Sequence, residues 1–239
     1  MLSIIIPALN EEKYLPLLLE SIKKQSFRDY EIILADAGSA DKTVEVARKY
    51  GCIITPGGLP SKGRNEGAKI AKGDLLLFLD SDVILSQADS LERAIQNFYE
   101  EKFGGATFPF LFTGGTIYRF FSRFYNFWVV FTKKFFPHAL GAFILVKKDI
   151  HQKINGFDEN VIFCEDVHYV GKVKKITKYG LLKIQPVLIS NRRFEQEGKI
   201  KSCIKYILAE LYMVFLGPVK TDIFKYRFGH YKDKDAPKN

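Results

Sequence analysis

Two closely spaced carboxylates, Asp80 and Asp82, are the first candidates for chemistry in this sequence. They directly follow residues 75–79, the most apolar short run of the chain. In an extended segment, residues two apart project to the same side, so both carboxylates can face one ligand. Like charges this close repel unless a cation compensates them, and Mg²⁺ or Mn²⁺ carrying a diphosphate would do so. The alternative without a ligand is a turn in which Asp80 caps a following helix and Asp82 is solvated.

The elements around this pair predict an open α/β sheet. Four short apolar runs lack the polar alternation of half-exposed strands, so we expect buried parallel strands. These runs are residues 2–6, 30–35, 52–55 and 75–79. Helices are expected between them at residues 11–24, 41–50 and 63–71. Elements that alternate in this way form a doubly wound, Rossmann-like single sheet, with helices on both faces and ligands beyond the carboxyl ends of its strands.

Polar residues stand at three of these strand ends, where such a ligand is expected. They are residues 7–11, 36–41 and 80–82. No Gly-x-Gly-x-x-Gly follows the first run and no Gly-Lys-Ser/Thr follows any run, so the signatures of dinucleotide-binding and P-loop proteins are absent. The sequence therefore predicts that carboxylates, rather than a glycine-rich loop, hold the ligand.

Motifs spread over residues 2–198 resemble those of glycosyltransferase family 2, whose members are inverting, nucleotide-sugar-dependent enzymes with the GT-A fold. The segments that carry the resemblance are residues 3–12 (opening strand and loop), 36–43 (second-strand motif), 62–67 (Gly-Arg-x-x-Asn-x-Gly in compressed form), 80–82 (Asp-x-Asp), 156–166 (Gly-Phe-Asp-Glu, then Glu-Asp) and 191–194 (Arg-Arg-Phe). Asn155 stands where members often have a second glycine, and residues 167–169 depart from the usual continuation. The sugar and the acceptor therefore do not follow from the resemblance.

The resemblance implies a role for individual residues. Asp166 would be the catalytic base that takes the proton of the acceptor hydroxyl, and Glu165 would contact the donor sugar or orient the base. Asp82 would hold the divalent metal, and Asp80 would contact the metal or the ribose. The other residues expected to bind the nucleotide sugar are Pro7, Ala8, Asn10, Glu11, Asp36, Ser39, Arg64 and Ser81. Without the upstream motifs, Glu165 and Asp166 would indicate only an exposed acidic pair.

Two of these residues also bear on the kind of donor. The carboxylate of Asp36 can accept a hydrogen bond from the ring N–H of uracil or guanine, so a UDP- or GDP-sugar is expected. The guanidinium of Arg64 would reach the diphosphate or the carboxylates of Asp80 and Asp82.

Charge is distributed unevenly along the chain. The 239 residues include 36 Lys and Arg against 27 Asp and Glu, which gives a formal net charge of +9. Residues 1–101 have a net charge of −4, whereas residues 102–148 and 171–205 carry +7 and +8. An acidic N-terminal half argues against a nucleic-acid partner. The basic stretches favour a phosphorylated or membrane-borne acceptor, such as a polyprenyl phosphate or a lipid-linked glycan.

We expect a GT-A domain over residues 1–198, made of a nucleotide-sugar-binding half (1–101) and an acceptor half (102–198). Residues 199–239 would form a C-terminal amphipathic helix and tail. Residues 98–137 hold 16 of the 34 aromatic residues, and an insert at about 112–137 places them in a helical stripe beside Arg and Lys. Such a helix suits the membrane surface. It could instead pack on a second helix expected at residues 200–216, or across a homodimer.

Neither a signal peptide nor a run of about 20 apolar residues is visible, and the three cysteines are scattered. These features predict a cytoplasmic protein, at the inner face of the cell membrane if the insert binds lipid.

Two other functions share parts of this pattern. A sugar-phosphate nucleotidyltransferase on a similar fold needs a glycine-rich basic loop after the first strand, and residues 7–12 contain no Gly, Lys or Arg. A non-catalytic, membrane-binding GT-A-like protein would have no use for Asp36, Asp80, Asp82 and Asp166 together.

Overall fold

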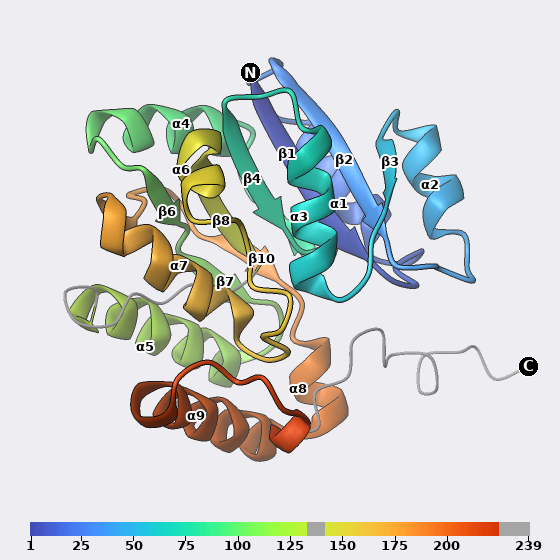
Figure 1. Cartoon of the computed structure of the whole chain (residues 1–239). Coiled ribbons are helices and arrows are strands. Elements are labelled where there is room, and N and C mark those ends of the chain that lie inside the picture. The colour runs from blue at the N-terminus through green and yellow to red at the C-terminus, as the bar shows by residue number, and fades with distance from the viewer. Residues whose placement is uncertain (133–141, 225–239) are drawn as a thin grey trace, which may run out of the picture.

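A seven-stranded sheet in the order β3-β2-β1-β4-β8-β6-β9 forms the centre of the molecule (Figure 1). The computed structural model describes residues 1–132 and 142–224. The strands of this sheet are β1 (Leu2–Ala8), β2 (Tyr30–Asp36), β3 (Ile53–Pro56), β4 (Leu75–Leu79), β6 (Gly105–Thr107), β8 (Phe143–Lys147) and β9 (Tyr179–Leu181). Strands β1 to β4 are parallel, β8 is antiparallel to β4 and β6, and β9 is parallel to β6. The four predicted strands are confirmed, with ends that differ by at most two residues.

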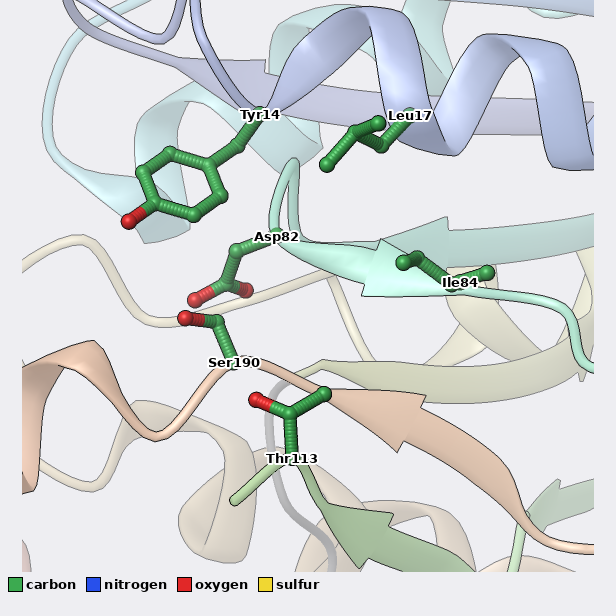
Figure 2. Close-up of a pocket in the computed structure, with 6 residues that line it drawn as sticks. All are labelled: Tyr14, Leu17, Asp82, Ile84, Thr113 and Ser190. Atoms are coloured by element: carbon green, nitrogen blue, oxygen red, sulfur yellow. The ribbon is translucent and has the colours of Figure 1, made fainter.

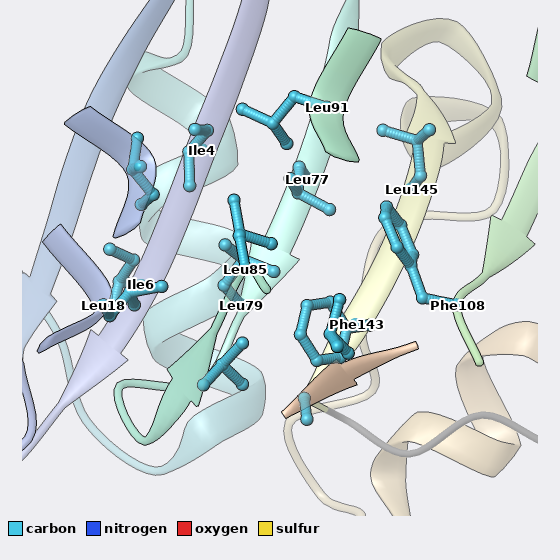
Figure 3. Packing of buried hydrophobic residues seen from close by; sticks show 14 of the residues in the cluster. Ile4, Ile6, Leu18, Leu77, Leu79, Leu85, Leu91, Phe108, Phe143 and Leu145 are labelled. Atoms are coloured by element: carbon cyan, nitrogen blue, oxygen red, sulfur yellow. The ribbon is translucent and has the colours of Figure 1, made fainter. Parts of the chain in front are cut away.

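Helices cover both faces of this sheet, as the apolar runs predicted. The six that do so are α1 (Leu15–Lys23), α2 (Thr43–Lys49), α3 (Pro60–Ile70), α4 (Ser90–Glu100), α6 (Lys148–Lys153) and α7 (Glu165–Ile176). Alternate residues of a strand point to opposite faces. Ile4 and Ile6 accordingly pack with Leu18 of α1 on one face (Figure 3), whereas Ile5 packs with Ala68 of α3 and Val170 of α7 on the other.

A second, three-stranded sheet was not predicted from the sequence. It consists of β5 (Val83–Ile84), β10 (Val187–Ile189) and β7 (Phe110–Phe112) in the order β5-β10-β7. Strands of two or three residues are too short to show periodicity. The sheet is important for the site because β5 begins directly after Asp82 and the pair β5–β10 brings residues near 190 alongside it, with Ser190 donating its N–H to the Asp82 carbonyl at 3.1 Å.

Helices α5 (Thr116–Thr132), α8 (Arg192–Glu197) and α9 (Lys199–Leu216) lie at the end of the molecule opposite β3, followed by a 3₁₀ turn at Asp222–Phe224 (Figure 1). They confirm the predicted helical insert and C-terminal helix. The remainder of the insert, residues 133–137, and of the tail, residues 225–239, lies outside the described residues. Among the helices of the described ranges, none combines the length and apolar character needed to cross a bilayer.

Candidate active site

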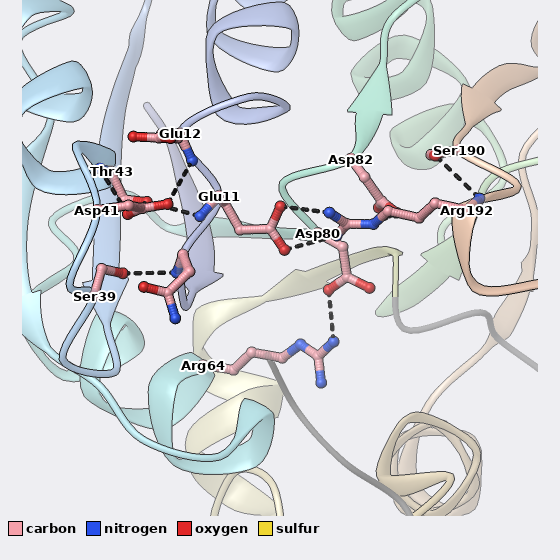
Figure 4. Close-up of polar contacts among 11 residues, drawn as sticks. Glu11, Glu12, Ser39, Asp41, Thr43, Arg64, Asp80, Asp82, Ser190 and Arg192 are labelled. Carbon is pink, nitrogen blue, oxygen red and sulfur yellow. Dashed lines mark hydrogen bonds and ion pairs between the residues drawn. The ribbon is translucent and has the colours of Figure 1, made fainter. Parts of the chain in front are cut away.

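The predicted site residues gather at the carboxyl ends of β1, β2 and β4 and on α3 (Figure 4), with Glu165 and Asp166 at the start of α7. Pro7 and Ala8 end β1 and are buried. Helix α3 packs so closely there that a Cβ added to Gly63 would lie 3.1 Å from the Cβ of Pro7. Ser81 is buried in the turn between β4 and β5. These three side chains therefore form the base of the site rather than its polar surface.

The loops after β1 and β2 are held together by hydrogen bonds. Asn10 has a positive φ of 57°, and its N–H donates to the Ser39 hydroxyl at 2.9 Å. The Asn10 side-chain oxygen in turn accepts from the N–H of Ala40 at 2.9 Å. The Asp36 carboxylate accepts from the N–H groups of Gly38 and Ser39, each at 3.1 Å. The two loops thus form one prearranged unit at the end of the sheet.

Arg64 of α3 joins the two halves of the site. Its Nη2 contacts Asp80 Oδ1 at 2.9 Å, and its Nη1 contacts Glu165 Oε1 at 2.7 Å. The Arg64 side chain is only 2% exposed and its guanidinium lies 5.3 Å from the centre of the Phe157 ring. Burial opposes its charge, but Asp80 and Glu165 more than compensate, so that the pKa of Arg64 is raised. One buried cation therefore fixes the position of carboxylates from β4 and α7.

Arg192 of α8 is a member of the site that sequence reasoning missed. Its Nη1 and Nη2 bind the two carboxylate oxygens of Glu11 at 2.7 and 2.6 Å, and its Nε lies 3.2 Å from Asp82 Oδ2. The guanidinium stacks on Tyr14, 4.3 Å from the ring centre. Residues 191–194 carry an Arg-Arg-Phe motif, but nothing in the spacing shows that Arg192 meets a residue 181 positions earlier.

The alternative in which Asp80 caps a helix and Asp82 is solvated is wrong. A strand, β5, follows Asp82, and the Asp82 side chain is only 15% exposed. Burial raises the pKa of Asp82 to about 6, against the opposing effect of Arg192. An additional cation beside Asp82 would stabilise its charged form and lower its pKa.

The residues present fit a divalent cation that shares its ligands with a substrate. Within the described ranges, no three His, Cys, Asp or Glu side chains cluster as a self-contained metal site. Mg²⁺ and Mn²⁺ favour oxygen ligands, and Mg²⁺ is commonly held by one or two carboxylates with phosphate and water completing its shell. Asp80 and Asp82 supply that number, and the Asp80 side chain is 40% exposed.

Glu165 and Asp166 open helix α7, directly after Cys164, whose φ of 55° turns the chain into the site. They are not an exposed acidic pair, because Glu165 is 12% exposed and paired with Arg64. Asp166 Oδ1 accepts the N–H of Val167 at 2.8 Å. Burial, followed by the charge of Glu165, raises the pKa of Asp166 to about 7, against the opposing charge of Arg64. Asp166 can therefore exchange a proton near neutral pH.

A small pocket of about 130 Å³ lies beside Asp82 (Figure 2). The Asp82 carboxylate and the Ser190 hydroxyl point toward one another across it, and the ring of Tyr14 stands above Asp82. Sites for organic ligands usually enclose roughly 300–1,000 Å³, so a molecule of nucleotide-sugar size would extend beyond this pocket.

Comparison with known proteins identifies the family. The sequence model of glycosyl transferase family 2 matches residues 3–154, more than half of the chain. The chain belongs to glycosyltransferase family 2. The matched range includes Asp36, Asp80 and Asp82 and ends before Glu165 and Asp166.

Relatives with curated names match shorter stretches. The chain is 37% identical over 113 residues to the 4,4'-diaponeurosporenoate glycosyltransferase of Staphylococcus haemolyticus, covering 44% of this chain and 30% of that protein. It is 40% identical over 102 residues to a PGL/p-HBAD biosynthesis glycosyltransferase of Mycobacterium tuberculosis, covering 39% and 40%. The chain therefore spans less than half the length of these two relatives.

Solved structures of glycosyltransferases share the fold, which confirms the predicted GT-A architecture. S. aureus TarS 1-349 aligns with a TM-score of 0.65 at 21% identity, over 88% of this chain and 65% of that one. The mannosyltransferase PcManGT from Pyrobaculum calidifontis, in complex with GDP-Man and Mn²⁺, aligns with a TM-score of 0.65 at 19% identity, over 80% and 56%.

Proposed function

We propose that this chain is an inverting glycosyltransferase that moves a sugar from a UDP- or GDP-sugar to an acceptor hydroxyl or phosphate. The observation that carries the proposal is the buried Arg64, which ties Asp80 at the end of β4 to Glu165, the neighbour of Asp166. This arrangement supports a site that combines a cation-binding carboxylate, Asp80, with a base, Asp166, that can take up a proton. Relatives named as glycosyltransferases, and a neighbour in complex with GDP-Man and Mn²⁺, support it.

In this proposal the loops after β1 and β2 bind the donor nucleotide. Asp36 accepts the ring N–H of the base, and the linked Asn10 and Ser39 border the base and ribose. Asp82 and Asp80 hold the divalent cation, which when bound neutralises the charge that develops on the leaving nucleoside diphosphate. Arg64 and Arg192 balance these carboxylates when no cation is present.

Asp166 acts on the acceptor. Its carboxylate takes the proton of the acceptor oxygen as that oxygen attacks C1 of the sugar from the face opposite the leaving group, which inverts the anomeric centre. Glu165, fixed by Arg64, keeps the start of α7 oriented toward the donor. We also propose that the acceptor is phosphorylated or lipid-linked, because the chain segments that follow residue 101 include the stretches of charge +7 and +8.

Nucleotide binding should depend on a metal. Isothermal titration calorimetry with UDP and with GDP should detect binding that Mn²⁺ strengthens, since a cation held by Asp82 and Asp80 would neutralise the charge of the diphosphate. Asp82→Asn should reduce the increase in nucleotide affinity that Mn²⁺ causes by at least about tenfold. Asp89→Asn, at a surface ion pair with Arg93, is the matched control and should bind as wild type does. If neither nucleotide binds with Mn²⁺ present, the proposal is wrong.

The transfer rate should rise with pH through neutrality. Only the ionised form of Asp166 accepts a proton, and burial holds its pKa at about 7 instead of the ordinary 3.8. At pH 5 about 1% of the carboxylate is ionised, so kcat should be about 100-fold below its plateau above pH 8. Initial rates of nucleoside diphosphate release at saturating donor and acceptor measure this. A kcat that does not change from pH 5 to 8 would show that no base with a pKa of about 7 takes part in the reaction.

A further inference from the structure

Exposed apolar side chains are concentrated on two neighbouring helices of this structure. Of the twenty large apolar side chains that are exposed in the described part of the chain, twelve belong to α5 and α9. On α5 they are Ile117, Phe120, Phe121, Phe124, Phe127 and Phe131. On α9 they are Ile204, Ile207, Leu208, Leu211, Phe215 and Leu216. We call these twelve side chains the apolar rim.

Each helix exposes one face and buries the opposite one. The rim residues of both helices recur mostly at steps of three and four, which places them along one side of a helix. On the opposite side of α5, the Ser122 hydroxyl accepts the N–H of Phe112 at 2.8 Å and Val129 is buried. On the opposite side of α9, Ala209 is buried among Phe163 and its neighbours. The rim side chains are therefore not the ones that pack α5 and α9 onto the rest of the protein.

The charge beside the rim is positive. Arg119 and Arg123 of α5 are exposed and form no ion pair with any described residue, and α5 contains no Asp or Glu. Lys201 of α9 is also exposed. A second copy of the chain docking through this surface would bring like charges together, whereas an anionic partner would be attracted. Amphipathic helices that combine Phe and Leu with Arg and Lys lie in the headgroup region of bilayers.

The faces of α5 and α9 opposite the rim pack toward the proposed base. Cys164, two residues before Asp166, packs in the same cluster as Ala209 of α9. Tyr125 of α5 is partly buried against the main core, and its burial, followed by the charges of Glu210 and Asp166, raises its pKa. The buried faces of both helices thus lie toward the start of α7, and the rim lies on their far side.

We infer that α5 and α9 dock this protein on the surface of an anionic bilayer, with the rim in the headgroup region and the start of α7 behind the two helices. The inference rests on the proposed function for one of its consequences: an acceptor anchored in that bilayer would be held close to Asp166. The docking itself involves no transfer step. It therefore stands or falls separately from the glycosyltransferase proposal.

Vesicle flotation tests the docking with the intact chain. The wild type should float with vesicles of phosphatidylcholine containing 30% phosphatidylglycerol, and several-fold less with pure phosphatidylcholine. The variant Phe120→Ser/Phe124→Ser/Phe127→Ser should lower the partition coefficient at least tenfold, because it removes three exposed rings. Arg119→Glu/Arg123→Glu should remove the preference for anionic vesicles. The control Ile70→Ser/Tyr99→Ser alters exposed apolar side chains of α3 and α4, outside the rim, and it should float as wild type does.

Two results would overturn the inference. The first is failure of the wild type to float with anionic vesicles at low salt. The second is a concentration-dependent dimer, measured by sedimentation, that the triple serine variant abolishes, since the rim would then bind a second copy. Calorimetry with UDP and GDP on the same variants keeps the two proposals apart. Each variant should bind nucleotide as wild type does. If the wild type itself binds neither nucleotide, only the proposed function is contradicted.

Discussion

Replacing Asp166 by Asn is expected to abolish sugar transfer while nucleotide binding persists. The amide has the shape of the carboxylate, and its oxygen can still accept the N–H of Val167. It cannot take a proton from the acceptor, so the contribution of a general base, about 10²–10⁴-fold in kcat, should be lost. Because burial already opposes the charge of Asp166, the variant should unfold at the same temperature as wild type or slightly above it.

The measurement is the initial rate of nucleoside diphosphate release with donor and acceptor, paired with calorimetry for nucleotide affinity. Asp158→Asn is the matched control, because Asp158 is a carboxylate on the loop before α7 that pairs with the exposed Lys220. It should retain the wild-type rate. An Asp166→Asn variant that transfers sugar at the wild-type rate would exclude Asp166 as the base and leave Glu165 as the remaining carboxylate at the start of α7.

The second large effect concerns stability. Arg64→Met should lower the free energy of unfolding by about 3 kcal/mol, because it leaves Glu165 and Asp80 as uncompensated charges. Removing one partner of a fully buried pair costs about 3–5 kcal/mol, and the partial exposure of Asp80 places this case near the lower limit. Urea unfolding followed by circular dichroism measures the difference.

Lys69→Met provides the control on the same helix. Lys69 pairs with Glu66 at the surface, so its removal should cost less than about 1 kcal/mol. Arg64→Lys separates charge from geometry, because a lysine keeps the charge but has a single nitrogen in place of the two terminal nitrogens with which Arg64 contacts Asp80 and Glu165. We expect its stability to lie between those of wild type and Arg64→Met. If Arg64→Met is as stable as Lys69→Met, Arg64 does not hold the site together.

The parallel half of the fold was predictable because its strands are buried on both faces. Residues 75–79 are uniformly apolar, and the structure buries all five of them in β4. The position of Asp80 and Asp82 follows from this strand, since polar residues at the end of a buried parallel strand must face the ligand edge. The hydrogen bond between Asn10 and Ser39 has the same origin, because neighbouring parallel strands end side by side.

The rest of the site depends on contacts between residues far apart in the sequence, which the sequence pattern does not predict. The contact between Arg192 and Glu11 requires the β5–β10 pairing, and β5 contains two residues. Strand β8 pairs antiparallel with β4, which departs from the repeated strand-helix pattern that predicted the first half. Helices α5 and α9 were predictable from their periodicity, but the periodicity alone did not show whether their apolar faces pack or remain exposed.

The ion pairs of Arg192 with Glu11 and Asp82 limit where this protein can be cut into fragments or joined to another chain. The stretch that matches the family model ends at residue 154, yet one side of its ligand edge is completed by an arginine that lies 38 residues further along the chain. A fragment cut at that boundary would lack the positive charge that separates these two acidic groups. Chimeras that exchange the C-terminal part between family members would accordingly need a matched pair, with the arginine and its acidic partners inherited together. The strand motifs alone therefore do not complete this site, and Arg192, Glu11 and Asp82 have to be exchanged as one set.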